Sequence, residues 1–370
     1  LTGLFFHNIA RRWPTCPAID PNGHWMDGME IAELEDGGVT SEHKDWFTQQ
    51  LKFTITPLEG WNIYAEGAMR TSNEKKTTSK IPVYSYDIDG NPYLRDSGYG
   101  TVSNVYDNRF RQNYYAVNVY TDYTRNFGLH NGKIMVGLNY ERYDQDNLWG
   151  RGDKLTTTDK PFLSQAQENM KTGDGYWNRA TAGYFARLNY DYKERYLVSA
   201  SIRSDKSSKF AKGNRVGYFP SVSVGWNIHE ENFFNIEWIS KMKIRASYGE
   251  LGANFIDSYS FLSTAYGPIP SVFGENQIGQ SSVMNGYVTK FAQENLTWEK
   301  SISKNVALEM AFLNNKISFT AEYFWKDNND LLAPLLPLAS SGQTIMTNGG
   351  DLPVFNSASV ENKGFEFTVG

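Results

Sequence analysis

The stretch YLVSASIRSDKSSKFAKGNRVGYFPSVSVGWN, residues 196–227, decides the fold. Apolar and polar residues alternate in both of its outer parts. One face of the first part holds Tyr196, Val198, Ala200 and Ile202. The other face holds Ser199 and Arg203, and Arg195, which immediately precedes the stretch, continues it. A period of two indicates a β-strand with one apolar and one polar face. The stretch therefore predicts two antiparallel strands, near 195–204 and 218–228, joined by a polar loop.

The same period recurs along the whole chain. We count eleven such segments, near residues 47–56, 61–69, 115–123, 134–141, 178–190, 195–204, 218–228, 242–249, 298–313, 316–326 and 362–370. Segments of about ten residues with strict alternation are typical of strands that cross a membrane in a β-barrel. We therefore expect an all-β protein whose eleven strands form an antiparallel barrel wall.

The alternation also predicts which side chains share a face. The apolar face, which we expect to contact lipid, includes Phe53, Ile63, Val119, Val136, Val198 and Ile244. The polar face, which we expect to line the lumen, includes Lys52, Asn62, Asn118, Glu141, Arg203 and Arg245.

The connections between segments alternate between short and long. Short ones lie at 57–60, 125–131, 191–194, 229–241 and at Asn314-Asn315, which favours a type I′ hairpin. Long ones lie near 72–111, 143–177, 205–217, 250–297 and 327–361. Outer-membrane barrels have short periplasmic turns and long extracellular loops. This pattern predicts that residues 1–45 belong to an extracellular loop region and that residues 46–370 form the barrel strands.

The composition agrees with a barrel and excludes other classes. Aromatic residues make up 15% of the chain although its mean hydropathy is −0.53, as expected where lipid-facing and lumen-facing residues alternate. The chain has no run of about 18 apolar residues, which a membrane-spanning helix would require. The N-terminus does not resemble a signal peptide. The net charge of −5 argues against nucleic-acid binding, and the single Cys16 excludes an internal disulfide.

Catalytic and metal motifs are weak. Ser-x-x-Lys occurs at Ser41, Ser72, Ser240 and Ser301, which marks the pattern as chance. The five histidines lie too far apart for a local zinc pair. Asp87 to Asn91 resembles the start of a calcium loop but lacks the closing carboxylate, so a turn is the better interpretation. The sequence predicts no enzyme, no catalytic residue, no cofactor and no metal.

Aromatic residues in the long connections are the candidate contacts for a ligand or a partner. They are Trp13, Trp25, Tyr84, Tyr86, Tyr93, Trp149, Trp177, Tyr259 and Tyr266. Flat rings with polar tips suit sugars and peptides alike. The alternative is that these rings pack the loops against one another. The basic residues Lys206, Lys209, Lys212 and Arg215 are interpreted as a solvated loop.

Residues 196–234, ending in WNIHEENFF, resemble the SusC/RagA family of TonB-linked outer-membrane proteins. WISKMKIRASYGELGAN from Trp238, NLTWEKSISKNVALEMAFLNNKISFTAEYFWKDNNDLL from Asn295 and NKGFEF from Asn362 extend the resemblance in the family's order. It implies a barrel of about 22 strands with a plugged lumen. It also implies a SusD-like surface lipoprotein as lid, and TonB-driven import of oligosaccharides or, less often, peptides.

Two points remain open at this stage. Eleven strands do not close an antiparallel barrel, and neither a plug nor a TonB-contacting segment is recognised, so we expect the sequence to be part of a larger barrel. A passive porin shares the alternation and the sorted loops and is the alternative function. Selectivity lies in loop conformation, so the sequence does not name the substrate.

Overall fold

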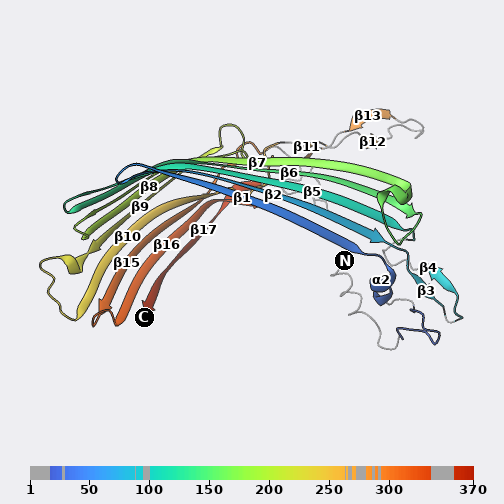
Figure 1. The fold of residues 1–370 in the computed structure, drawn as a ribbon, viewed down its shortest axis with the longest axis horizontal. Helices are drawn as coiled ribbons and strands as arrows, with labels where there is room; N and C mark the ends of the chain where they lie inside the picture. The colour runs from blue at the N-terminus through green and yellow to red at the C-terminus, as the bar shows by residue number, and fades with distance from the viewer. Residues whose placement is uncertain are drawn as a thin grey trace. The chain divides into compact units, whose positions relative to one another are not determined.

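The computed structural model describes residues 17–26, 30–87, 89–94, 101–262, 264–265, 269–271, 281–285, 288–290, 293–334 and 354–370. Eleven strands form one sheet in the order β1-β2-β5-β6-β7-β8-β9-β10-β15-β16-β17 (Figure 1). Their bounds are Thr40–Leu58, Trp61–Lys80, Asn104–Phe127, His130–Leu155, Ala166–Tyr192, Tyr196–Ser207, Val216–Asn227, Ile239–Ala253, Glu299–Phe312, Ile317–Pro334 and Val354–Val369. The expected number of strands and their sequential antiparallel order are confirmed.

Short elements lie outside the main strands. They are α2 (Glu30–Asp36), β3 (Tyr84–Tyr86), β4 (Pro92–Leu94), β11 (Thr264–Ala265), β12 (Ile269–Ser271), β13 (Ser281–Asn285) and β14 (Val288–Lys290). Single 3-10 turns, η1 (Leu163–Gln165) and η2 (Ile228–Glu230), complete the list. Within the described ranges, no helix has the length and hydropathy needed to cross a membrane.

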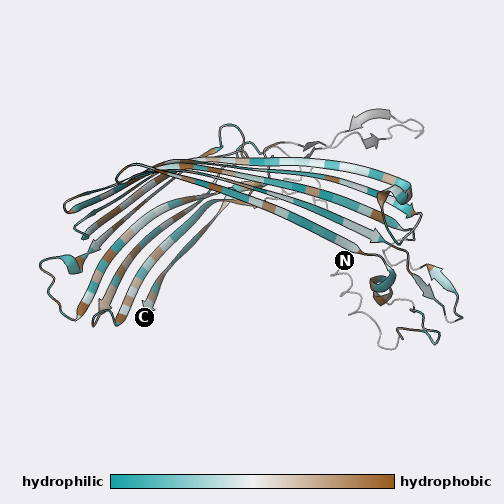
Figure 2. Ribbon diagram, in the orientation of Figure 1, coloured by the Kyte–Doolittle hydropathy of each residue, from teal (hydrophilic) through white to brown (hydrophobic). Residues whose placement is uncertain are grey.

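The chain divides into two compact units. Unit 1 comprises residues 1–49, 69–114 and 144–177, and unit 2 comprises 50–68, 115–143 and 178–370. Unit 1 holds the polar ends of the long strands together with α2 and the β3–β4 hairpin. Unit 2 holds the amphipathic parts of the strands, and brown and teal alternate along β10, β15 and β16 there (Figure 2).

Several strands are longer than the alternation predicts. β6 and β7 contain 26 and 27 residues and leave only residues 156–165 between them, so the expected loop at 143–177 is wrong. The added residues are mostly polar on both faces, as in NMKTGDG from Asn169. A strand with water on both sides has no apolar face, so its period of two cannot be detected from hydropathy.

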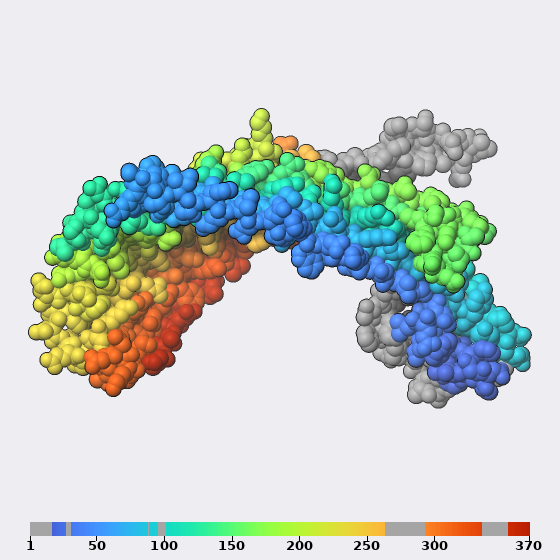
Figure 3. Space-filling model, in the orientation of Figure 1, coloured from blue at the N-terminus to red at the C-terminus, as the bar shows by residue number. Residues whose placement is uncertain are grey.

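The sheet is open in the part of the chain that the structure describes. β1 and β17 each have one neighbouring strand, and aromatic side chains on them are well exposed, with Phe53 at 64% and Phe367 at 68%. The last three strands lie side by side, as the orange and red bands of Figure 3 show. An open edge presents unpaired backbone donors and acceptors to any strand that adds to it.

The turn between β15 and β16 adopts a left-handed backbone at three successive residues. Asn314 and Asn315 have φ of 59° and 63°, as the sequence predicts, but Leu313 also has a positive φ of 52°. The paired residues Phe312 and Ile317 enclose four turn residues, so the expected two-residue type I′ turn is wrong. The amide of Lys316 donates to the Phe312 carbonyl at 3.0 Å, which closes this wider turn.

We expect Asn315→Val to destabilise the turn by about 1–2 kcal/mol, because a β-branched residue is strained in the left-handed region. Asn315→Gly is the matched control, since glycine adopts a positive φ without that strain. Denaturant titration of the folded barrel in detergent measures both free energies of unfolding. Equal stability of the two variants would contradict the assigned turn conformation.

Candidate functional site

The polar face of unit 2 begins with a charge pair between the first two strands. Lys52 of β1 lies 2.9 Å from the carboxylate of Glu66 on β2. The hydroxyl of Tyr120 on β5 donates to the same carboxylate at 3.0 Å. Three strands are thus joined through one acidic side chain. Because Tyr120 and Asn118 are two residues apart on one strand, Asn118 shares this face.

The next strands are joined through Asp122, whose side chain is 4% exposed. Its carboxylate accepts a hydrogen bond from Asn62 of β2 at 3.2 Å and lies 3.3 Å from the ammonium of Lys133 on β6. A carboxylate this well covered is stable only with such partners. Asp122 therefore ties β2, β5 and β6 together on the polar face.

Arg203 of β8 reaches across an intervening strand. Its guanidinium donates to Asp205 at 2.6 Å and to Asn139 of β6 at 2.7 Å, and β7 lies between the two strands. Gly183 of β7 makes this possible, because a Cβ there would lie 2.2 Å from an Asp205 oxygen. The absence of a side chain at residue 183 thus opens the path for a bond between next-nearest strands.

Arg245 of β10 links β10, β15 and β16 on the polar face. It donates to Glu309 of β15 at 2.8 Å and also to the carboxylate of Glu322 on β16. One guanidinium between two carboxylates removes the repulsion that the acids would otherwise exert. The polar residues that the sequence assigns to one face therefore do share it, from β1 through β16.

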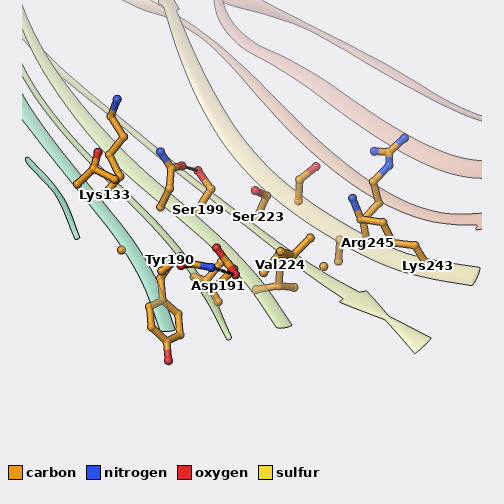
Figure 4. Close-up of a pocket in the computed structure, with 17 residues that line it drawn as sticks. Lys133, Tyr190, Asp191, Ser199, Ser223, Val224, Lys243 and Arg245 are labelled. Carbon is orange, nitrogen blue, oxygen red and sulfur yellow. Dashed lines mark hydrogen bonds between the residues drawn. The ribbon is translucent and has the colours of Figure 1, made fainter. Parts of the chain in front are cut away.

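The apolar residues lie on the opposite face. Val119, Val198 and Ile244 are between 36% and 40% exposed, each next to a less exposed polar neighbour, and Val136 is 44% exposed between less exposed neighbours. Figure 4 shows the two faces directly: Lys133 and Arg245 point to one side of the sheet, and Tyr190 points to the other. The amphipathic division is the structural basis for a barrel wall with lipid on one side and water on the other.

A hollow of about 630 Å³ lies over β5 to β10 within unit 2. Its polar lining includes Lys133, Asp191, Lys243 and Arg245 (Figure 4). Ser199 donates to Asn189 at 2.7 Å, and Asn131 donates to Asp191 at 2.9 Å along its floor. The hollow is within the size range of ligand pockets, and its hydroxyl, amide and charged groups exchange hydrogen bonds with polar solutes readily.

A compact apolar core joins two connections of unit 2, β8–β9 and β10–β15, to strand β9. It consists of Phe210, Phe219, Ile256, Leu296 and Trp298, each at most 8% exposed. Phe219 meets Trp298 edge to face at 5.5 Å, and Phe210 lies 5.4 Å from the same indole. Gly217 and Gly252 leave room for the Phe219 ring, since a Cβ at either would lie within 2.5 Å of it. The connections that follow β8 and β10 therefore have a core of their own.

Basic residues clamp this core, which corrects the interpretation of residues 206–215 as a solvated loop. The ammonium of Lys209 donates to the Asn254 carbonyl at 3.0 Å, and Arg215 donates to the Phe210 carbonyl at 2.9 Å. Burial lowers the pKa of Lys209, and the positive charge of Arg179 lowers it further. Of the four basic residues in this segment, only Lys206 and Lys212 are exposed. The sequence does not show that carbonyls from other loops are within reach.

The structure brings some of the predicted aromatic contacts together and separates others. Tyr84, Tyr86 and Tyr93 lie on the β3–β4 hairpin of unit 1, where Tyr86 stacks on His24 at 4.0 Å. Trp25 forms a bridge with Ile19, and Met26 bridges to Tyr86. Tyr84 and Tyr86 therefore share one face of the hairpin and Tyr93 lies on the other, while Trp25 precedes the residue that bridges to Tyr86.

The other predicted aromatics have different surroundings. Trp149 packs against Tyr106 at 5.9 Å and against Gly173, whose Cβ would clash with the indole. Trp177 is half-buried. In unit 2, the Tyr259 hydroxyl donates to Asn178 at 3.0 Å. Trp13 and Tyr266 lie outside the described residues. Trp149 therefore lies on strand β6 and packs against the neighbouring strands β5 and β7.

The calcium-like motif forms a turn, as the sequence suggests. The Asp87 carboxylate accepts backbone hydrogen bonds from Asp89 at 3.0 Å and from Asn91 at 2.8 Å. These bonds, with the Asn91 side chain as the largest cause, lower the pKa of Asp87. Within the described segments, no group of three or more His, Cys, Asp or Glu side chains is placed to hold a metal ion.

The turn between β9 and β10 is anchored by Glu231. Its carboxylate accepts hydrogen bonds from Tyr196 at 2.6 Å, from Trp226 at 3.0 Å and from Arg195 at 3.2 Å. The Tyr196 and Trp226 donors, followed by the Arg195 charge, lower the pKa of Glu231. The sequence shows this acid only as part of the HEENFF motif and does not reveal its three donors.

We expect Glu231→Gln to lower the unfolding temperature, because it removes the charge that these donors stabilise. Since the folded pKa is depressed, the contribution is present above the ordinary glutamate pKa of roughly 4.3 and is lost as pH falls through the folded value. The two proteins should therefore converge in acid. The exposed Glu237 of the same turn supplies the control variant, Glu237→Gln. Thermal unfolding at neutral and acidic pH measures the effect, and a pH-independent difference would contradict it.

Comparison with known proteins agrees with this geometry. Residues 22–370 match the family described as TonB dependent receptor-like, beta-barrel. The TonB-dependent receptor SusC of Bacteroides thetaiotaomicron is 30% identical over 341 residues, which are 90% of this chain and 30% of SusC. The TonB-dependent receptor P3 of Formosa agariphila is 30% identical over 255 residues, 68% of this chain and 24% of that receptor.

Among solved structures, the RagAB peptide transporter has a TM-score of 0.75 at 20% identity, covering 90% of this chain and 34% of that chain. A sheet with one apolar face, one polar face and sorted connections defines the wall of an outer-membrane β-barrel. The chain belongs to the TonB dependent receptor-like, beta-barrel family, and its resemblance to SusC/RagA proteins is confirmed. It spans less than a third of the length of the curated relatives SusC and P3.

Proposed function

We propose that this chain forms part of the wall of a TonB-dependent importer that moves oligosaccharides across the outer membrane. The observation that carries the proposal is the continuous polar face from β1 to β16, on which Glu66, Asp122, Arg203 and Arg245 are all paired. A wall of paired charges, hydroxyls and amides offers hydrogen bonds to a sugar without trapping it at an uncompensated charge.

The aromatic residues of the long connections are the proposed capture surface. Among those that the structure describes, Tyr84 is the most accessible at 51% exposure, followed by Tyr259 at 40% and Tyr93 at 39%. Exposed tyrosines provide apolar contact area and a polar tip, which matches the face and edge of a sugar ring. The same chemistry accepts peptides, and the fold shared with the RagAB peptide transporter makes peptides the second candidate substrate.

The proposed partners follow from the SusC relationship. A SusD-like surface lipoprotein is expected to close over the extracellular connections and to deliver the substrate. TonB is expected to supply energy through other parts of the full-length protein. No residue of this chain is assigned a catalytic role, and the reaction is transport without covalent chemistry.

Uptake by cells that express the full-length protein tests the proposal. Uptake of a fluorescent oligosaccharide should require TonB and should fall when the lipoprotein is deleted. Uptake that persists without TonB would instead support a passive porin. A labelled peptide taken up in place of the oligosaccharide would change the substrate class but leave active import intact.

We expect Tyr84→Ala to weaken oligosaccharide binding roughly two- to tenfold, because one aromatic contact is worth about 0.5–1.5 kcal/mol. Tyr184→Ala is the matched control, since Tyr184 is 68% exposed on the apolar face of unit 2. Titration of the purified full-length complex with the oligosaccharide measures the affinity. Equal losses in both variants would show that the β3–β4 hairpin is not a capture surface.

A further inference from the structure

The apolar face of unit 2 carries a second hollow, of about 320 Å³, between β9, β10, β15 and β16. Its floor is Ala246, which pairs with Val224 on one side and with Val306 on the other. Because Val224 pairs with Val198, the hollow lies on the face opposite the polar networks. The small Ala246 side chain leaves an apolar gap in a row of larger residues.

Aromatic rings close the hollow toward the long connections. Tyr248, two residues beyond Ala246, pairs with Lys304, and Lys304 pairs with Trp325. Tyr323 pairs with Val306 and forms the wall below Trp325. The result is a short apolar groove with a polar, aromatic upper end, which has the shape of a site for one acyl chain under a headgroup.

Lysines at the upper end supply donors for a phosphate. Lys304 and Lys363 lie over the Trp325 ring, with ammonium-to-centroid distances of 4.7 Å and 5.7 Å. Lys363 is ion-paired with Glu361 at 2.7 Å, and Lys304 is ion-paired with Asp327 at 3.8 Å, a separation too long for a hydrogen bond. The Lys304 ammonium is therefore able to donate to a phosphate oxygen while its long stem stays against the ring.

The depth of the groove indicates which leaflet it contacts. Alternate residues on a strand tilted by about 45° are separated by roughly 5 Å along the membrane normal. Counted from Phe312 at the short-turn end, Val306 and Lys304 lie roughly 14 and 19 Å along an apolar band of about 25 Å. The groove thus lies in the leaflet nearer the long connections, with Lys304 near the headgroup level.

We propose that this groove is a binding site for a phosphorylated, acylated lipid of the extracellular leaflet, with one acyl chain over Ala246 and its phosphate on Lys304. The proposed site requires only that the sheet is inserted in the membrane. It does not depend on which substrate the barrel imports. The lipid would cover the apolar gap between β9 and β15 and would bridge strands that have no direct contact with each other.

Ala246→Leu tests the site by filling the groove on a face that contacts no protein core. Ala321→Leu is the matched control, because Ala321 pairs with Leu308 on the same face outside the groove. Delipidated full-length protein is titrated with lipid A in detergent, and bound lipid is counted by native mass spectrometry. We expect about tenfold weaker binding in Ala246→Leu and unchanged binding in Ala321→Leu. Equal binding by the two variants would overturn the site.

A second pair of variants tests the phosphate contact. Lys304→Met should weaken lipid A binding roughly tenfold, whereas Lys304→Arg should retain it, since both cations donate to phosphate. Dephosphorylated lipid A should bind the native protein as weakly as phosphorylated lipid A binds Lys304→Met. If the dephosphorylated lipid binds as tightly as lipid A, the groove recognises acyl chains alone and the phosphate assignment is wrong. Heat-modifiable migration on gels confirms that each variant is folded.

Discussion

Val198→Arg is expected to impair assembly of the barrel severely, at a cost of about 2–4 kcal/mol, because it places a charge on the lipid-facing side near the middle of the membrane. Val198 is paired with Tyr190 and Val224, so apolar side chains surround it along the sheet. The fraction of protein that migrates as the folded, heat-modifiable species, together with denaturant titration in detergent, measures the loss.

The neighbouring residue supplies the control. Ser199→Arg places the same side chain over the hollow of about 630 Å³ on the polar face, where water is available. It loses one hydrogen bond, from Ser199 to Asn189, worth about 1 kcal/mol. We therefore expect near-normal assembly. Equal impairment of the two variants would show that the faces are assigned the wrong way round or that neither contacts lipid.

Trp298→Ala is expected to disorder the connections that follow β8 and β10, at a local cost of about 3–5 kcal/mol. The indole touches Phe210 and Phe219, and its ring N–H donates to the Arg215 carbonyl at 3.0 Å. Its removal leaves a cavity and an unpaired carbonyl in the same core. Tryptic cleavage after the exposed Lys212 should become rapid, and amide exchange over residues 207–215 should accelerate, while the strands stay protected.

Phe255→Ala is the matched control for this core. Phe255 is next to the buried Ile256 but is itself 84% exposed, so its truncation should change stability by no more than about 0.5 kcal/mol. Protection of residues 207–215 should be unchanged. If Trp298→Ala leaves cleavage after Lys212 as slow as in the native protein, these connections are ordered by something other than their shared apolar core.

The sequence by itself determined the features that depend on local chemistry. A period of two along residues 196–227 is a property of one strand and its two environments, so it needs no knowledge of the neighbouring strands. The left-handed conformation of Asn314 and Asn315 is likewise a property of the residue type and its place between two strands. Strand number, sequential order and the assignment of Lys52, Arg203 and Arg245 to one face follow from the same local rules.

The tertiary structure alone decided where strands end and which polar groups meet. β6 extends to Leu155 and β7 begins at Ala166, because neighbouring strands supply backbone hydrogen bonds to these residues. Hydropathy does not report such bonds. Arg203 reaches Asn139 only because Gly183, which has no side chain, lies between them. Lys209 donates a hydrogen bond to the carbonyl of Asn254, 45 residues away. Such contacts depend on register across several strands. Local alternation specifies the face of each residue, but it does not specify the register that selects its partner.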